Sequence, residues 1–219
     1  MDSVRRFALT EALAATALIM ALAAGNHLLP GVWSTGSGII AALVMLWLPV
    51  LVIHYRKRDF HAYGLTGARW WSDVKIGTCM AVLVLPPFAF GYWLFWGAIV
   101  GHEMAWRIDA QVAWQLLHQL AAVALPEEVF FRGYLLTLLH RVWPGKQRAW
   151  VGAYGPAVLL SSALFALAHA LPQWQPLRLT VFFPALLFAY LRVRTGSVTA
   201  AIVLHGLANV AVFVIAGKL

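Results

Sequence analysis

Two adjacent carboxylates and an arginine lie inside an apolar stretch of the sequence. Residues 126–133 read PEEVFFRG, and long apolar runs flank them. Ionisable side chains in the hydrocarbon of a bilayer cost roughly 2.5 to 3.5 kcal/mol each on insertion scales, so they are typical of functional sites. The whole chain holds only eight Asp and Glu residues. An acidic pair at this place therefore marks a candidate site.

The spacing within this segment separates the two carboxylates. Glu128 and Arg132 are four residues apart, so on a helix they lie on one face and can form an ion pair. Glu127 points about 100° away from that face and is free to meet another helix. We therefore expect Glu128 and Arg132 to support the site, and Glu127 to act in it.

Two later apolar runs carry polar side chains that could meet Glu127. His169 ends the segment FALAH, whereas His205 and Asn209 of the segment HGLAN lie one turn apart on one helix face. At 1.5 Å per residue, Glu127 and His169 lie about 20 Å from the basic ends of their runs, Asn209 about 16 Å and His205 about 10 Å. A single polar site made from three helices is therefore geometrically possible.

Such a site suits the activation of water. A desolvated carboxylate can act as a general base, a histidine can share its proton, and an imidazole with an amide can donate to a developing oxyanion. Ser161 and Ser162 lack the GxSxG context of a nucleophile, so we expect peptide-bond hydrolysis without a covalent intermediate. The alternative is zinc on Glu127, His169 and His205 with a position open for water, although the sequence has no HExxH motif.

The composition predicts what must position these residues. Of the 219 residues, 62% are hydrophobic and 11% charged, far from the charged share of about 25% in soluble domains. We expect an all-α, polytopic transmembrane bundle of about seven spans, with residues 1–219 forming a single integral membrane domain. The apolar runs cover approximately residues 7–25, 38–55, 74–100, 112–140, 154–171, 178–192 and 198–217.

The basic residues predict an orientation. Most of the sixteen Lys and Arg residues lie on one side if the runs alternate, which makes the N-terminus cytoplasmic and the C-terminus external in what we expect to be a bacterial inner (plasma) membrane. Because these charges lie between apolar runs, the net charge of +8 does not indicate binding to nucleic acid. Glu11 interrupts the first run, so we expect a retained helix rather than a cleaved signal peptide.

Two further features concern the third and fourth runs. Pro86, Pro87 and Gly91 predict a break or kink in the third helix. Polar residues make the outer part of the fourth helix hydrophilic, where they could line a water path to Glu127 or contact another helix. These residues are Gln111, Gln115, His118 and Gln119.

Three motifs in order carry a resemblance to a known family. They are EExxFRG from Glu127, FxxxH from Phe165 and HxxxN from His205, with RTGS at residues 194–197 before the last run. The set resembles the CAAX-protease and bacteriocin-processing family of intramembrane endopeptidases, also described as type II CAAX prenyl proteases or the abortive-infection family. The resemblance covers about residues 112–217, the expected motif-bearing protease core.

The resemblance implies an intramembrane protease of the glutamic type without a cofactor. Its substrate is expected to be a peptide or protein with a membrane-associated tail, cleaved near the C-terminus; prenylated CaaX tails, leader peptides and sorting-signal tails all fit, and membrane lipids are the other partner. Descriptions of the family as metalloproteases keep Zn²⁺ as the alternative. The implied roles are water activation by Glu127 and His169, oxyanion stabilisation by His205 and Asn209, and support by Glu128 and Arg132.

Two functions of other classes use similar residues. Buried Glu and His also serve in transporters and proton relays, although the two halves of the sequence show no paired broken repeats. A non-catalytic immunity protein could keep the same fold. The filled motif positions favour the protease over both.

Overall fold

The computed structural model describes residues 3–28, 32–144, 152–172 and 174–216. Every regular element in these ranges is a helix, as the composition predicts. In chain order the elements are α1 Ser3–Leu28, α2 Val32–Tyr55, η1 His61–Tyr63, α3 Trp70–Tyr92, η2 Trp93–Ile99, α4 Gln111–His118, η3 Gln119–Ala124, α5 Leu125–Glu128, η4 Val129–Leu135, α6 Leu136–Val142, η5 Gly152–Tyr154, α7 Gly155–Ala170, η6 Pro176–Val181, α8 Phe182–Thr195 and α9 Thr199–Ala216.

Several consecutive elements join into longer rods. The π-helix η2 continues α3, the elements from α4 to α6 form one helix over residues 111–142, η5 leads into α7 and η6 leads into α8. The described part of the chain then has seven rods besides the short helix η1. Among the described residues, five helices are long and apolar enough to cross a membrane: Ser3–Gly25, Gly36–Tyr55, Trp70–Ile99, Pro176–Thr195 and Thr199–Ala216. The all-α membrane bundle predicted from the sequence is confirmed, and the chain is an integral membrane protein.

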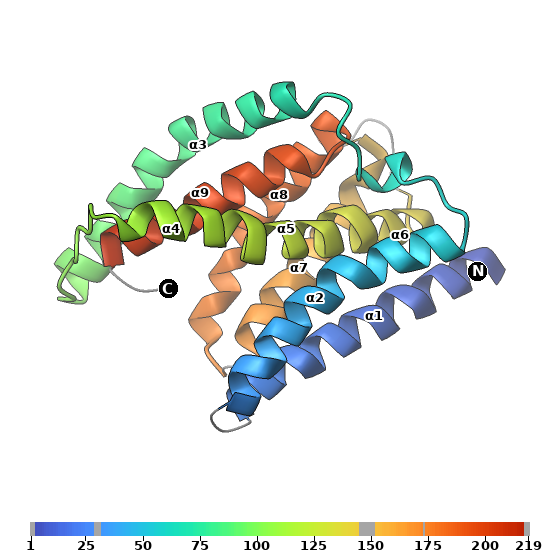
Figure 1. Ribbon diagram of the computed structural model, residues 1–219, viewed down its shortest axis with the longest axis horizontal. Helices are drawn as coiled ribbons and strands as arrows, with labels where there is room; N and C mark the ends of the chain where they lie inside the picture. The colour runs from blue at the N-terminus through green and yellow to red at the C-terminus, as the bar shows by residue number, and fades with distance from the viewer. Residues whose placement is uncertain (1–2, 29–31, 145–151, 173, 217–219) are drawn as a thin grey trace.

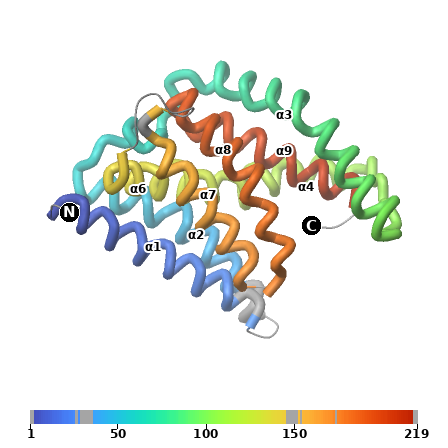
Figure 2. The backbone as a smooth tube through the Cα atoms, turned by 180° about the vertical axis from the view of Figure 1, so that it is seen from behind, coloured from blue at the N-terminus to red at the C-terminus, as the bar shows by residue number. Residues whose placement is uncertain are grey.

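The rod over residues 111–142, which we call the central helix, runs through the middle of the bundle. The α1–α2 pair packs against one of its ends, and α9 packs along the other with α3 on top of it. Helices α7 and α8 pack on each other behind it, as the reverse view in Figure 2 shows. The central helix therefore has neighbours on several sides, whereas α3 packs mainly on α9.

Burial follows this arrangement. Phe130, Leu135 and Leu138 of the central helix are completely inaccessible, whereas Val82 and Leu83 on the outer face of α3 are 71% and 70% exposed. Exposed apolar side chains on a helix of this length match a lipid environment, where such surface costs nothing. Glu128 and Arg132 of the central helix, at 0% and 1% exposure, are thereby shielded by other helices rather than by lipid.

The break or kink predicted from Pro86, Pro87 and Gly91 begins just after these residues. Helix α3 continues through both prolines, and the backbone departs from α-helix only at Trp93, where the π-helix begins. Both proline side chains are exposed, so the bend that their missing N–H groups favour displaces no neighbouring helix. Helix α3 therefore curves gradually over α9 and has no sharp kink at the prolines (Figure 1).

One end of the bundle gathers the loop after α2 and the turn between α8 and α9. The Arg69 guanidinium donates to the carbonyl of Thr195 at 2.9 Å, and that of Arg192 donates to the carbonyl of Ala62 at 3.0 Å. Gly196 ends α8 in the left-handed region with φ 76°, which a residue without Cβ adopts freely. The N-terminus lies toward this end, and the described part of α9 finishes at the opposite one (Figure 1).

A partly buried polar cluster ties the central helix to α1. We call it the Glu11 cluster: Glu11, Arg58, Tyr63 and Tyr134. Arg58 donates to both oxygens of Glu11, at 2.6 and 2.9 Å, and the Tyr134 hydroxyl donates to Oε1 at 2.6 Å. Arg58 also donates to the Tyr63 hydroxyl at 3.0 Å. The hydrogen bond to Glu11 raises the pKa of Arg58, and burial raises the pKa of Tyr63, so both stay protonated at neutral pH.

Candidate active site

The two glutamates lie where the central helix changes its winding. A π-helix over Gln119–Ala124 precedes the short α-helical stretch Leu125–Glu128, and a second π-helix over Val129–Leu135 follows it. Segments of π-helix are rare and occur frequently at functional sites, since the wider turn redirects the side chains that follow. Pro126 lacks an N–H group, which favours a change of hydrogen-bonding pattern near this point.

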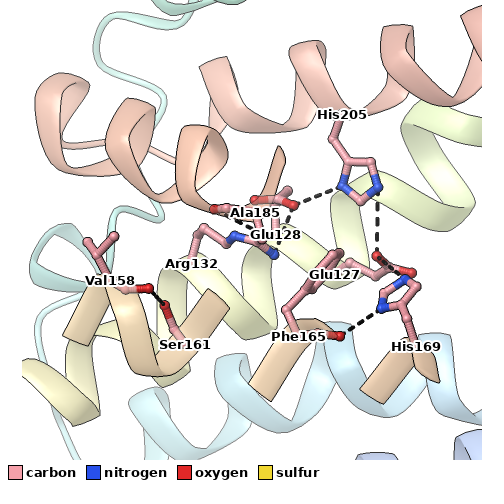
Figure 3. A network of polar contacts seen from close by, with 9 residues as sticks. All are labelled: Glu127, Glu128, Arg132, Val158, Ser161, Phe165, His169, Ala185 and His205. Carbon is pink, nitrogen blue, oxygen red and sulfur yellow. Dashed lines mark hydrogen bonds and ion pairs between the residues drawn. The ribbon is translucent and has the colours of Figure 1, made fainter. Parts of the chain in front are cut away.

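Glu127 faces two imidazoles that come from two other helices. Its Oε2 atom is 3.8 Å from Nε2 of His169 on α7 and 3.8 Å from Nε2 of His205 on α9 (Figure 3). The same oxygen is buried and has no hydrogen-bond partner. The Glu127 side chain is 15% exposed, that of His169 26% and that of His205 6%. The structure thus brings together three of the predicted site residues around one unsatisfied oxygen.

The other nitrogen of each imidazole is held by an acceptor. Nδ1 of His169 is 2.9 Å from the carbonyl oxygen of Phe165, and Nδ1 of His205 is 2.8 Å from Oε1 of Glu128. A carbonyl and a carboxylate only accept hydrogen bonds, so both Nδ1 atoms carry the hydrogen. In a neutral ring Nε2 is then an acceptor. Both imidazoles therefore present a basic nitrogen to Glu127.

Three acceptors that converge in this way need a hydrogen donor between them. A water molecule meets this need because it donates two hydrogens, one to the carboxylate and one to an imidazole, and keeps a lone pair for attack. The exposure of His169 leaves one side of the group open to solvent or substrate. The arrangement of Glu127, His169 and His205 is therefore suited to activating water.

The ion pair expected between Glu128 and Arg132 is present. Arg132 Nη1 lies 3.2 Å from Glu128 Oε1, the two side chains are 1% and 0% exposed, and Nη2 donates to the carbonyl of Ala185 at 3.4 Å. The hydrogen bond from His205 to Glu128 was not predicted, because the spacing within one helix says nothing about α9. Glu128 thus links the buried charge of Arg132 to the orientation of His205.

Two aromatic rings hold these groups in place. Phe188 of α8 stacks on His205 with ring centres 4.8 Å apart and planes 13° from parallel. Phe165 packs against His169 at 4.3 Å, and its ring lies 4.1 Å from the guanidinium carbon of Arg132, within cation–π range. Sequence reasoning missed Phe188, since an apolar residue in an apolar helix gives no signal of a site.

Asn209 occupies a different position from the three central residues. Its Nδ2 donates to Oε1 of Gln119 in the central helix at 2.9 Å. Asn209 lies one turn beyond His205 on α9 and is partly buried. The role of Asn209 and His205 as oxyanion donors stays a prediction, and the hydrogen bond to Gln119 is a contact that the sequence did not indicate.

Glu127, His169 and His205 are also the donor set of the zinc alternative. Within the described ranges, no three His, Cys, Asp or Glu side chains are arranged to hold a metal ion. Nε2 of His169 and Nε2 of His205 are each 3.8 Å from Glu127 Oε2, whereas ligands about 2.0 to 2.1 Å from one tetrahedral zinc lie roughly 3.3 Å apart. As placed, these atoms lie farther apart than the ligands of one zinc ion, and zinc stays an alternative prediction.

Comparison with protein families places this site in a matched region. Residues 109–211 match the family model described as type II CAAX prenyl endopeptidase Rce1-like. The match begins just before α4 and ends within α9, so it includes the two glutamates, both imidazoles and Asn209. No match was found among curated proteins or among solved structures.

Proposed function

We propose, from the premise that residues 109–211 belong to the CAAX protease family as an Rce1-like domain, that the protein is an intramembrane endopeptidase of the glutamic type. It hydrolyses a peptide bond near the C-terminus of a substrate whose tail lies in or at the bilayer. The observation that carries the proposal is the unsatisfied oxygen of Glu127, 3.8 Å from Nε2 of His169 and 3.8 Å from Nε2 of His205.

The first chemical step is the attack of water on the scissile carbonyl. Glu127 takes a proton from the water while the water oxygen bonds to the carbonyl carbon. The carbonyl oxygen then becomes an oxyanion. Nε2 of His169 or His205 shares the proton. When the C–N bond breaks, the proton passes to the departing amine, so no covalent intermediate with the enzyme is formed.

The contacts of His205 fix which of its two ring nitrogens carries a hydrogen. Glu128 accepts from Nδ1 and is itself paired with Arg132, so the hydrogen on Nδ1 stays fixed and Nε2 is the nitrogen that faces Glu127. A protonated Nε2 is a donor, and with Asn209 it would stabilise the oxyanion. The same imidazole can thus accept the proton of water and later hold the negative oxygen.

The order of the helices supports an orientation of the chain in the membrane. The basic loop after α2 lies toward the same end as the N-terminus, which agrees with a cytoplasmic N-terminus and an external C-terminus in a bacterial plasma membrane. The partners are then membrane lipids and a peptide tail in the bilayer. A prenylated CaaX tail is the first substrate to test, because the matched family is described by it.

The test uses the full chain reconstituted in liposomes with an internally quenched, farnesylated CaaX peptide. Glu127→Gln should abolish cleavage with an unchanged melting temperature, whereas Glu103→Gln, in an exposed loop, should cleave as the wild type does. Cleavage by the Glu127→Gln variant at the wild-type rate would overturn the glutamic mechanism. Proteomics of membrane fractions with either protein then identifies tails that accumulate unprocessed.

The metal question has its own measurement. Activity should persist in EDTA, because the proposed base is a carboxylate and not a metal-bound hydroxide. Loss of cleavage in EDTA and its return with Zn²⁺ would instead assign Glu127, His169 and His205 as zinc ligands.

A further inference from the structure

Gln119 forms a buried hydrogen bond with Asn209, away from the three central residues. Its side chain, on the first residue of the π-helix η3, is buried. Oε1 of Gln119 accepts from Asn209 Nδ2 at 2.9 Å, and Nε2 of Gln119 lies 3.4 Å from Oε1 of Gln115, one turn earlier. The three amides form a short chain that leads from α4 to α9.

The backbones of α9 and η3 come close at the neighbouring position. A Cβ atom built on Gly206 would lie 2.5 Å from Cδ2 and 3.0 Å from Cγ of Leu120, a contact that larger residues rarely tolerate. Glycine at this position therefore permits the close approach. Because Leu120 follows Gln119, the same approach brings Gln119 within hydrogen-bond reach of Asn209.

The amide chain determines how Asn209 is turned. Gln119 uses Nε2 toward Gln115, so the group that it offers to Asn209 is the oxygen, and the NH₂ end of Asn209 must face it. Nδ2 carries two hydrogens, and one of them remains available. A donor to an oxyanion is effective only when its direction is set before the reaction. Without a hydrogen-bond partner, the partly buried Asn209 amide could rotate, and its N–H groups would not be held in one direction.

We propose that Gln119 is a positioning residue that orients the Asn209 amide as an oxyanion donor. The inference rests on the proposed protease function and adds a residue from the polar part of the central helix to its site. Gln119 itself does not touch the reacting atoms; it acts through Asn209.

The hydrogen bond can be tested without any substrate. The chain contains two asparagines, Asn26 and Asn209, so protein labelled with ¹⁵N in the asparagine side chains gives two amide signal pairs, assigned with Asn209→Ala. Gln119→Met keeps the length of the side chain but removes the acceptor, and it should shift the Asn209 pair. Gln111→Met, on the exposed start of α4, should leave that pair in place. An unmoved Asn209 pair in Gln119→Met would overturn the proposal.

The catalytic consequence is tested with the farnesylated CaaX peptide and a double-mutant cycle. Asn209→Ala should lower kcat about 100-fold or more, as removal of one oxyanion donor does. Gln119→Met should lower kcat about 10-fold with KM unchanged, and should have no further effect in the Asn209→Ala background. Gln119→Glu keeps an oxygen at the same place and should restore most of kcat.

The outcomes separate this proposal from the proposed function. Equal losses from Gln119→Met with and without Asn209 would assign a purely structural role to Gln119 and overturn the proposal while the protease stands. A lower melting temperature of Gln119→Met without a change in kcat would also overturn the proposal. If the wild type fails to cleave the peptide, the proposed substrate is wrong, and the amide spectra still decide whether Gln119 orients Asn209.

Discussion

Two acidic groups contact the central helix from different sides and differ in how completely their oxygens are hydrogen-bonded: Glu11 on α1, and the pair Glu127 and Glu128 on the central helix itself. In the Glu11 cluster both oxygens of Glu11 accept hydrogen bonds, from Arg58 and from Tyr134. At the site, Oε2 of Glu127 and Oε2 of Glu128 are both buried without a hydrogen-bond partner. The oxygens of Glu11 all bind donors from other parts of the chain and so join helices. Glu127 and Glu128 each keep one oxygen that binds no donor.

The difference teaches how to separate structural from functional polarity in a membrane bundle. A buried polar atom without a partner costs roughly 1 to 3 kcal/mol, so a group that only stabilises the fold is expected to be fully bonded. The Glu11 cluster meets this expectation. Glu127 does not, and its oxygen faces two basic nitrogens that are themselves fixed by other acceptors. Substitutions at the two groups should therefore have opposite effects on activity and stability.

The largest expected effect is on activity, from His169→Gln. A glutamine amide cannot take up a proton, so cleavage should fall about 10³- to 10⁴-fold, near the upper range for loss of acid–base catalysis. The melting temperature should hardly change, since the side chain is partly exposed. Peptide cleavage in liposomes measures the effect, with His118→Gln on the outer face of α4 as the matched control. Wild-type cleavage by the His169 variant would contradict its role.

Arg132→Met comes next and should act on stability. Breaking a buried ion pair costs roughly 3 to 5 kcal/mol, because the remaining carboxylate of Glu128 is buried and uncompensated. Thermal unfolding in detergent should show a much lower midpoint. The double variant Glu128→Gln with Arg132→Met should recover part of the loss. An unchanged midpoint for the single variant would exclude the supporting role of this pair.

Glu11→Gln tests the other side of the comparison. It removes the charge that Arg58 and Tyr134 bind, and the free energy of unfolding should fall by about 2 kcal/mol, the usual value of hydrogen bonds to a charged group. The rate of peptide cleavage per folded molecule should stay near that of the wild type. A selective loss of activity without loss of stability would show that the Glu11 cluster is not merely structural.

The smallest expected effect is that of Tyr134→Phe. It deletes one hydroxyl that donates to Glu11, while Arg58 continues to satisfy the carboxylate, so the loss should be about 1 kcal/mol. Unfolding in detergent measures it. A loss as large as that of Glu11→Gln would mean that Tyr134 rather than Arg58 holds the cluster together.

The sequence predicted the helices and the central residues for identifiable reasons. Apolar runs of bilayer length specify spans directly, and ionisable residues inside them stand out because they are costly there. The four-residue spacing predicted the pair of Glu128 with Arg132, which the structure shows. The motif set led to the family that residues 109–211 match.

The remaining contacts depend on packing between helices. The bond from His205 to Glu128 and that from Asn209 to Gln119 join residues 77 and 90 positions apart, and no local spacing encodes them. The π-helical turns around the glutamates change the direction of side chains that a regular helix would place elsewhere. Phe188 is invisible to a search for polar residues, although it stacks on a site imidazole.

The position of the acidic pair has a consequence for biosynthesis. The central helix is not among the helices that are apolar enough to enter a bilayer unaided, and its Glu127, Glu128 and Arg132 would each cost roughly 2.5 to 3.5 kcal/mol in lipid. We therefore expect the packing of other helices, such as α1 and α2, against the central helix to offset this cost. Since His205 lies on α9, Glu128 acquires this imidazole partner only when α9 has joined the bundle.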